Sequence, residues 1–303
     1  MNGDDIYSGF FGMNPVNTII KWTGGKSRLI NQIRPFFNKS IFEEDSNVYI
    51  EPFAGSFAMA LYLKKKKMIL NDKNIKLMNF FEQVKIRPRK LLNKINKIID
   101  ESESRNDKEV FYYEKREFYN KLILVKGNSI TVAALFWYLN KTGFNGMYRE
   151  TASGKFNIPF GKRLCPRPDV QKFSDVSCAI KNAVLLHKPF KSVCAMAKQN
   201  DIVYLDPPYI PVSKTSSFSS YLRYGFGIED HKILCDEMKK MSNSGVYIVM
   251  SNSFCDMTEQ IYSVLKKDGF TFHEIEATRL ISGKSQGRGK IKELIITNMD
   301  NFK

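Results

Sequence analysis

The sequence predicts an α/β fold, either one large domain built on an open sheet or such a domain carrying an insertion. Short apolar runs alternate with segments of helical periodicity, which is the pattern of βα units. With 303 residues, the chain is long enough to bury one large core. Strands are predicted at 48–50, 68–71, 183–187, 202–205 and 246–250, with an antiparallel pair at 271–275 and 294–297.

The first two strands each lead to a potential ligand position. The run 48–50 is followed by Glu51-Pro52-Phe53-Ala54-Gly55 and a helix, as in the first strand, turn and helix of a nucleotide-binding sheet. The glycine spacing is not Gly-x-Gly-x-x-Gly, so a dinucleotide site is not indicated. The second strand ends at Asp72, which is suited to accept hydrogen bonds from ribose hydroxyls. A solvated helix cap is the alternative interpretation of Asp72.

Before the first strand, residues 18–27 predict an extended piece, a Gly24-Gly25 turn and a helix capped by Ser27 that runs through Phe36. Glycines permit close backbone approach to a ligand, and the start of a helix favours an anion such as a carboxylate. The end of this segment resembles a phosphate-binding P-loop. That motif needs a glycine where Ile20 stands, so the P-loop interpretation is rejected.

The middle of the chain is predicted to be helical. Apolar residues recur at helical spacing over 74–99, with an interruption at Pro88, and a polar linker at 101–107 precedes helices at 111–124 and 129–140. The C-terminal part alternates strand and helix again. Its helices are predicted at 170–180, 193–198 and 229–241, and a further helix follows the strand 246–250 and ends at Lys267. The loop 211–227 is suited to closing over a substrate.

Between the two parts, residues 142–163 are rich in turn-forming and basic residues, with apolar residues isolated among them. Phe144 and Met147 would be poorly protected in a plain loop, so they are candidates for insertion between base pairs. Arg149 is suited to reading a guanine edge in a major groove. The alternative interpretation is a β-hairpin with a buried phenylalanine.

The strand 202–205 delivers the tetrad Asp206-Pro207-Pro208-Tyr209 to a sheet edge, where ligands bind in open α/β sheets. The two prolines prevent further ladder pairing and hold the backbone extended. A carboxylate and a proline carbonyl can together accept both hydrogens of an exocyclic amino group, and Tyr209 offers a flat face to the ring that carries it. A strand followed by a structural Pro-rich turn is the alternative.

Charge and composition restrict the partners. Lys and Arg number 47 against 31 Asp and Glu, a formal charge of +16, which indicates a polyanionic partner without separating DNA, RNA and anionic membrane. No apolar run is long enough to span a bilayer, and the N-terminus shows no secretory signal, so a cytoplasmic protein is expected, nucleoid-associated if bacterial. The five cysteines form no Cys-x-x-Cys pair and do not cluster with histidines, so no metal site is expected.

Taken together, these segments resemble the Dam family of DNA adenine-N6 methyltransferases, which are D12 class, alpha-group enzymes. The resemblance extends from Lys21 to about Thr297. It implies a Rossmann-like sheet with an S-adenosylmethionine site and an inserted, mainly helical DNA-recognition domain. The matching pieces, in family order, are 21–26, 51–55, 144–149, 156–161 and 206–209.

Roles follow by position from this resemblance. It assigns catalysis to Asp206, Pro207, Pro208 and Tyr209, and the cofactor site to Trp22, Lys26, Phe53, Asp72 and Asp206. It assigns DNA contacts to Lys21, Phe144, Asn145, Met147, Arg149, Asn157, Pro159 and Lys162. Two positions depart from the family pattern, because Lys162 is commonly Arg and Ser253 stands where a His often follows Ser-Asn.

The expected activity is site-specific methylation of a flipped adenine in double-stranded DNA, with GATC as the leading target, S-adenosylmethionine as methyl donor and no metal. The catalytic domain is predicted to comprise 14–73 and 168–303, and the target-recognition domain 74–167. Two rival functions remain open. One is the same chemistry on RNA or on a protein glutamine, and the other is a non-catalytic DNA-binding protein that retains the fold.

Overall fold

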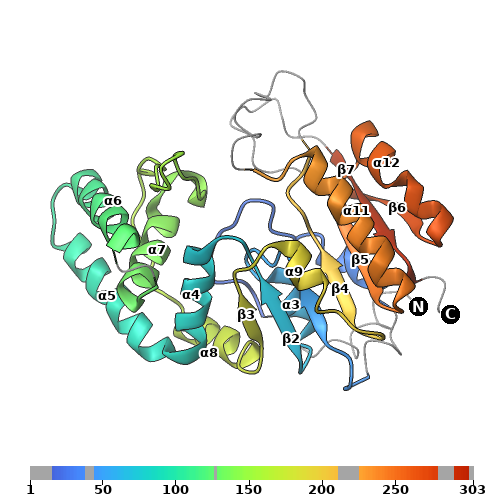
Figure 1. Ribbon diagram of the computed structural model, residues 1–303. Helices are drawn as coiled ribbons and strands as arrows, with labels where there is room; N and C mark the ends of the chain where they lie inside the picture. The colour runs from blue at the N-terminus through green and yellow to red at the C-terminus, as the bar shows by residue number, and fades with distance from the viewer. Residues whose placement is uncertain (1–15, 38–43, 126–127, 211–224, 279–289, 300–303) are drawn as a thin grey trace, which may run out of the picture. The chain divides into compact units, whose positions relative to one another are not determined.

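The computed structural model describes residues 16–37, 44–125, 128–210, 225–278 and 290–299 (Figure 1). In this part of the chain a mixed sheet of seven strands has the order β3-β2-β1-β4-β5-β7-β6, which confirms the predicted α/β class. Part of the predicted loop 211–227, residues 211–224, lies outside the described residues. The strands are β1 (Tyr49–Glu51), β2 (Met68–Asn71), β3 (Val184–Leu186), β4 (Ile202–Leu205), β5 (Tyr247–Ser253), β6 (Thr271–Thr278) and β7 (Lys290–Thr297).

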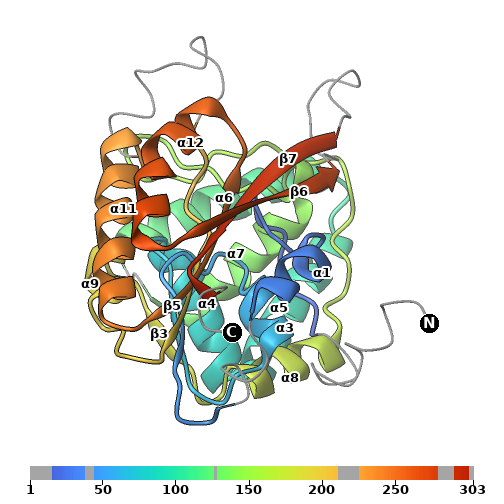
Figure 2. The ribbon, with the colours of Figure 1, turned by 90° about the vertical axis from the view of Figure 1, so that its right-hand side faces the viewer.

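The sheet combines parallel and antiparallel pairs. β1 pairs in parallel with β2 and β4, and β4 pairs in parallel with β5. All four residues of β4 are buried, as is typical of a central parallel strand covered on both faces. β7 is antiparallel to both β5 and β6, which confirms the predicted C-terminal pair. Figure 2 shows β6 and β7 running side by side beyond the bounds predicted for them.

The chain divides into two compact units. The first comprises 1–27, 54–64 and 71–187, and the second comprises 28–53, 65–70 and 188–303. The predicted catalytic domain, 14–73 and 168–303, and the predicted target-recognition domain, 74–167, are defined by function. They stay a prediction. Among the described residues of the second unit, the helices are α1 (Ile30–Ile33), α9 (Phe190–Cys194), α11 (Ile228–Asn243) and α12 (Asp256–Tyr262), with 3-10 turns η1 (Arg34–Phe36) and η3 (Ser263–Asp268).

Two helices of the second unit differ from prediction. Ser27 does not cap a helix through Phe36, because α1 begins only at Ile30 and Pro35, which has no N–H to donate, converts the next turn to 3-10 geometry. The helix predicted at 193–198 lies earlier in the chain, as α9. α9 ends at Cys194, and the Lys198 N–H donates to the Asp201 carboxylate at 2.9 Å, which turns the chain into β4.

The first unit is mainly helical. It contains α3 (Ala58–Leu63), α4 (Ile75–Ile86), α5 (Pro88–Glu103), α6 (Lys108–Val125), α7 (Ile130–Thr142), η2 (Phe144–Gly146) and α8 (Val170–Ala179) (Figure 1). α7 is apolar over most of its surface and packs against α4, α5 and α6, as expected of a central core helix.

Helix starts in this unit follow local chemistry. Pro88 separates α4 from α5 and occupies the first turn of α5, as predicted, and the Ser129 hydroxyl caps α7 by accepting from the Val132 N–H at 3.2 Å. The predicted linker 101–107 is too long, because α5 continues to Glu103. Ser102 belongs to the buried side of that helix, where its hydroxyl lies 3.2 Å from the Tyr138 hydroxyl. No helix among the described residues has the length and hydrophobicity that crossing a membrane requires.

Candidate active site

The first unit brings the turn after Trp22 against the loop that precedes α3. The Gly25 N–H donates to the Trp22 carbonyl at 3.2 Å and closes the predicted Gly-Gly turn, in which Gly24 has φ +80°. A Cβ built on Gly55 would lie 3.1 Å from Trp22 Cδ1, so the indole rests directly on this glycine. Gly55 also has φ +49°, a conformation that favours glycine. The close contact therefore depends on the absence of a side chain at Gly55.

Asp72 is tied to the same loop. Its Oδ2 accepts from the Gly55 N–H at 3.1 Å and its Oδ1 from the Asn74 N–H at 2.8 Å. Burial raises the pKa of the carboxyl, while these two N–H groups act to lower it. Each oxygen has a further lone pair, and the residue is partly exposed, so the carboxylate fits the two hydroxyls of a ribose. The cap of α4 is Asn74 instead, whose Oδ1 accepts from the N–H groups of Lys76 and Leu77 at 3.0 Å each.

Two further side chains complete this part of the first unit. Lys26 is only 4% exposed, and its Nζ donates to the Gly24 carbonyl at 3.4 Å. Trp22 stacks on Tyr148, with ring centroids 5.5 Å apart and an interplanar angle of 29°, and also contacts Phe136. The structure thus brings together Trp22 and Asp72, two of the residues predicted for the cofactor. The first unit also supplies Lys26, whereas Phe53 and Asp206 belong to the second unit.

The second unit holds the tetrad at the carboxyl end of β4, as predicted. Asp206 follows the last residue of the strand and is partly exposed, whereas Pro207 is buried and Pro208 is exposed. β4 lies between β1 and β5, so the tetrad stands at the same sheet edge as the Phe53 turn that follows β1. Phe53 contacts Phe190 and Phe226, with centroids 5.3 Å apart in each pair.

Tyr209 is anchored by a residue that the sequence analysis missed. Its hydroxyl donates to Oε1 of Glu293 on β7, whose side chain is only 2% exposed. Burial, followed by the nearby charges of Asp206 and Glu293, raises the pKa of the Tyr209 hydroxyl well above its usual range, so the phenol stays protonated. This hydrogen bond fixes the hydroxyl end of the Tyr209 ring to β7, so the sheet determines where the ring lies.

His231 on α11 is a second missed residue. Its Nε2 lies 3.1 Å from the Pro208 carbonyl, and its Nδ1 lies 2.8 Å from the Tyr262 hydroxyl. Burial lowers the pKa of the imidazole to about 4, so the ring is neutral at pH 7 and carries one N–H. Because a carbonyl can only accept, we assign that hydrogen to Nε2, and Tyr262 then donates to Nδ1. The proline turn is thereby held by a chain of two hydrogen bonds.

The predicted DNA-contact residues of the first unit gather on one turn and one hairpin. In the turn, Phe144 is 46% exposed and Asn145 has φ +53°. A Cβ on Gly146 would lie 2.6 Å from Lys21 Cδ, so Lys21 packs on this turn. Asn140, which the sequence analysis missed, joins the two segments. Its Oδ1 accepts from the Lys21 N–H at 3.0 Å, and its Nδ2 donates to the carbonyls of Lys21 and Gly146 at 2.8 and 2.9 Å.

The hairpin exists, but its buried phenylalanine is Phe156 and not Phe144. Phe156 is 2% exposed and lies opposite Glu150 in an isolated bridge. Arg149 is exposed, and its Nε donates to Asn157 Oδ1 at 2.8 Å. The remaining predicted contact residues in this region are Met147, which is partly exposed, and Pro159 and Lys162, which are exposed. A hairpin core and an exposed aromatic residue therefore coexist in this region, and insertion of Phe144 and Met147 between base pairs stays a prediction.

Comparison with known proteins gives a consistent result. Residues 22–281 match the model of the D12 class N6 adenine-specific DNA methyltransferases. The chain is 35% identical over 284 residues to a Type II methyltransferase, M1.LlaDCHI, from Lactococcus lactis subsp. cremoris, covering 93% of this chain and 95% of that protein. It is 34% identical over 292 residues to the Type II methyltransferase M.MjaIII from Methanocaldococcus jannaschii, covering 93% and 99%. It is 31% identical over 280 residues to a DNA adenine methylase from Haemophilus influenzae, covering 91% of each chain.

Proposed function

The chain belongs to the D12 class of N6 adenine-specific DNA methyltransferases, and on that premise we propose that it methylates a flipped adenine within GATC in double-stranded DNA. The methyl donor in this proposal is S-adenosylmethionine. The location in this proposal is the cytoplasm, in association with the nucleoid if the organism is bacterial. The observation that carries the proposal is the tetrad at the carboxyl end of β4, where an acidic side chain and an aromatic ring are held by the fold.

In the proposed mechanism the tetrad binds the base. The Asp206 carboxylate and the Pro207 carbonyl accept the two hydrogens of the adenine amino group, which orients the nitrogen lone pair for direct attack on a methyl group. As the nitrogen–carbon bond forms, the bond from that carbon to the donor sulfur would break and leave a neutral thioether, and the methylated amine would lose one proton to the Asp206 carboxylate or to water. Tyr209 stacks on the purine while Glu293 holds its hydroxyl. His231 fixes the Pro208 carbonyl and so restricts the turn between the carboxylate and the ring.

The cofactor residues fit the donor by their chemistry. Asp72 accepts from ribose hydroxyls in this proposal, which also assigns to the donor Trp22 and Lys26 of the first unit and Phe53 and Asp206 of the second unit. When bound, S-adenosylmethionine supplies a methyl group on a sulfonium, which is electrophilic without further activation. The protein's share of the reaction is to orient the amine and to exclude water.

The DNA residues have separate tasks in this proposal. Flipping a base costs a few kcal/mol, and insertion of Phe144 and Met147 into the stack offsets that cost. Arg149 reads a guanine, which is why GATC is the proposed target. Lys21, Asn145, Asn157, Pro159 and Lys162 contact the duplex around these residues.

The test uses Asp206→Ala. We expect the variant to lose methyl transfer by roughly 10²–10³-fold or more, the usual cost of removing a group directed at charge that develops in a transition state. DNA affinity should stay within about threefold, because the carboxylate contacts the base only after flipping. The measurement is transfer of labelled methyl from S-adenosylmethionine to a GATC duplex, with the product identified as N6-methyladenine.

The matched control is Asp256→Ala, an exposed aspartate in the first turn of α12, which should retain full activity. A duplex without GATC, an RNA of the same sequence and a glutamine-containing protein serve as alternative substrates. Full activity of Asp206→Ala would refute the assignment of the tetrad. Methylation of the RNA or the protein with none of the DNA would replace the proposed function with one of its rivals.

A further inference from the structure

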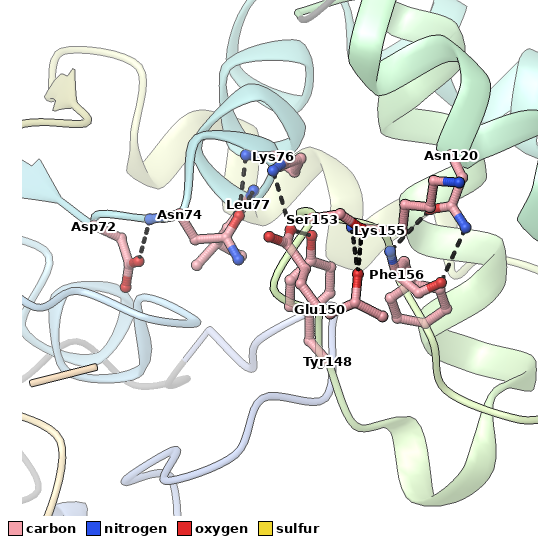
Figure 3. Close-up of polar contacts among 11 residues, drawn as sticks. Asp72, Asn74, Lys76, Leu77, Asn120, Tyr148, Glu150, Ser153, Lys155 and Phe156 are labelled. Atoms are coloured by element: carbon pink, nitrogen blue, oxygen red, sulfur yellow. Dashed lines mark hydrogen bonds and ion pairs between the residues drawn. The ribbon is translucent and has the colours of Figure 1, made fainter. Parts of the chain in front are cut away.

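One closed series of contacts in the first unit joins the cofactor residues to the recognition hairpin, 148–157. It starts at Asp72, which accepts from the Asn74 N–H, and Asn74 caps α4. In the first turn of that helix, Lys76 Nζ lies 3.0 Å from Glu150 Oε1 (Figure 3). Glu150 also accepts from the Tyr148 hydroxyl.

The series then returns to its start. Tyr148 stacks on Trp22, Trp22 rests on Gly55, and the Gly55 N–H donates to Asp72. Every link is a stack, a hydrogen bond, an ion pair or a van der Waals contact between residues of the same unit. Two of its members, Trp22 and Asp72, are proposed cofactor contacts.

Glu150 is the member of this series that follows Arg149 directly in the hairpin. Successive side chains of an extended segment point to opposite faces, so Tyr148 and Glu150 share one face and Arg149 takes the other. Accordingly, Tyr148 and Glu150 are partly buried and Arg149 is exposed. Whatever holds Glu150 therefore also sets the direction of Arg149.

The hairpin is anchored from its other side as well. The Asn120 side chain on α6 accepts from the Phe156 N–H at 2.8 Å and donates to the Phe156 carbonyl at 3.0 Å (Figure 3). The Asn157 N–H donates to the Arg149 carbonyl at 3.1 Å. One arm of the hairpin is thus fixed to α6, and the ion pair of Glu150 with Lys76 links the other arm to α4.

We propose that Glu150 is a positioning residue that couples cofactor binding to base recognition, so that a cofactor held at Trp22 and Asp72 strengthens the discrimination made by Arg149. The inference rests on the proposed function. A ligand that contacts Trp22 and Asp72 restrains two members of the closed series. The restraint passes through Tyr148 and Lys76 to Glu150, and from there to the backbone of Arg149.

The pair is suited to transmit such a restraint. The side chains of Lys76 and Glu150 are 21% and 26% exposed, so solvent screens their attraction less than it screens a fully exposed pair. Coupling between two binding sites is reciprocal, so DNA must raise cofactor affinity by the same factor by which the cofactor raises DNA affinity. Coupling factors of about 5–150 are typical of such systems.

The experiment measures this coupling by binding and needs no turnover. Dissociation constants of a GATC duplex, and of one with its guanine replaced, are determined with and without saturating S-adenosylhomocysteine. We expect the wild-type chain to bind the GATC duplex at least about fivefold more tightly with S-adenosylhomocysteine present. The coupling factor is the ratio of the DNA dissociation constants without and with S-adenosylhomocysteine. Glu150→Gln keeps an acceptor for Tyr148 but loses the charge, and its coupling factor should be at least about threefold smaller than that of the wild-type chain. The coupling factor of Lys76→Met should fall to the same extent.

Three comparisons separate this role from a general structural one. S-adenosylhomocysteine alone should bind both variants within about threefold of wild type. The exchange Lys76→Glu with Glu150→Lys should restore the coupling. Lys115→Met, which removes an ion pair of 2.6 Å with Glu101 elsewhere in the first unit, should leave it unchanged.

Absence of coupling in the wild-type chain, or an unchanged factor in Glu150→Gln and Lys76→Met, would overturn the inference. Neither result affects the proposed function, which is judged by adenine methylation with both ligands saturating. Conversely, a chain that transfers no methyl group to DNA would refute the proposed function even if S-adenosylhomocysteine and DNA bound with a measurable coupling.

Discussion

Protonation of the buried His231 side chain should make the stability of the fold depend on pH. The imidazole is fully buried on α11 and is held between the Pro208 carbonyl and the Tyr262 hydroxyl. Its pKa is about 4, below the usual histidine pKa of 6.5, because burial disfavours the charged ring. Protonation would place a second N–H on Nδ1, so the Tyr262 hydroxyl, which now donates to that nitrogen, would have to turn and accept instead.

The sign of the resulting pH dependence follows from proton linkage. Above pH 6.5 neither state holds the extra proton, and between pH 6.5 and about 4 the unfolded chain binds it while the folded chain does not. The wild-type free energy of unfolding should therefore fall as pH drops through this window, by up to about 3 kcal/mol from this group. Urea unfolding at pH 7, 5.5 and 4.5 measures it. His231→Gln should be less stable at pH 7 but lose less on acidification, and equal losses in both chains would contradict the assignment.

The sequence reveals some of these residues and hides others for a clear reason. Asp206 was predictable because its strand, its two prolines and its aromatic neighbour are adjacent in the chain. Glu293 lies 84 positions from Tyr209, and only the pairing of β7 with β5 brings it to the site. Asn140 likewise accepts a hydrogen bond from the Lys21 N–H, 119 positions away. Contacts of this kind depend on tertiary structure and leave no local pattern.

The recognition hairpin is the element on which target choice depends in the proposed function. We expect Arg149→Ala to relax discrimination at one base position by about 1–3 kcal/mol, since one bidentate contact to a guanine is removed. Thermal stability should change little, because the side chain is exposed. The measurement compares methylation rates on duplexes in which each base pair of the target is replaced in turn.

Lys155→Ala is the matched control for Arg149→Ala, because it removes an exposed cation from the same hairpin. It should weaken binding to all duplexes about equally and leave the target profile unaltered. If Arg149→Ala also kept the wild-type profile, Arg149 would have to be removed from the base-reading residues.

Element boundaries show where sequence patterns succeed. Pro88 separates α4 from α5 because its missing N–H and fixed φ act locally, whatever the rest of the fold does. The end of α5 was missed because the polar residues around Ser102 resemble a linker in sequence. In the structure they form a helical turn whose buried side contacts Tyr138. Burial of a serine on a helix is decided by the neighbouring helix and not by the segment itself.

The whole molecule carries a formal charge of +16, which should appear as a strong salt dependence of DNA binding. The logarithm of affinity should fall linearly with the logarithm of salt concentration, with a slope of about −0.9 for each phosphate neutralised. Lys21→Met and Lys162→Met should each reduce the slope by about 1 if they contact phosphates. Fluorescence anisotropy between 50 and 200 mM salt, typical limits for such titrations, measures it.

The control for these lysines is Lys97→Met, which removes an exposed cation on α5 outside the proposed contact set. Its slope should equal that of the wild-type chain. A reduced slope for Lys97→Met, or unchanged slopes for Lys21→Met and Lys162→Met, would show that the duplex follows a different path over the protein.

At the level of the whole fold, the alternation of strands and helices was sufficient to predict the class and the place of most strands. The order of strands in the sheet and the grouping of 71–187 with residues 1–27 were not predictable in this way. Both depend on pairings between segments far apart in the chain, such as that of Asn140 with Lys21. Periodicity reports which face of a segment is buried and not which partner buries it.

The attachment of Tyr209 to β7 has a consequence for biosynthesis. The ribosome makes the tetrad 206–209 well before it makes Glu293, so in a nascent chain the Tyr209 ring at first lacks its anchor. The ring can be fixed only after the last strand has left the exit tunnel and inserted between β5 and β6. Full assembly of the tetrad therefore has to follow the synthesis of β7.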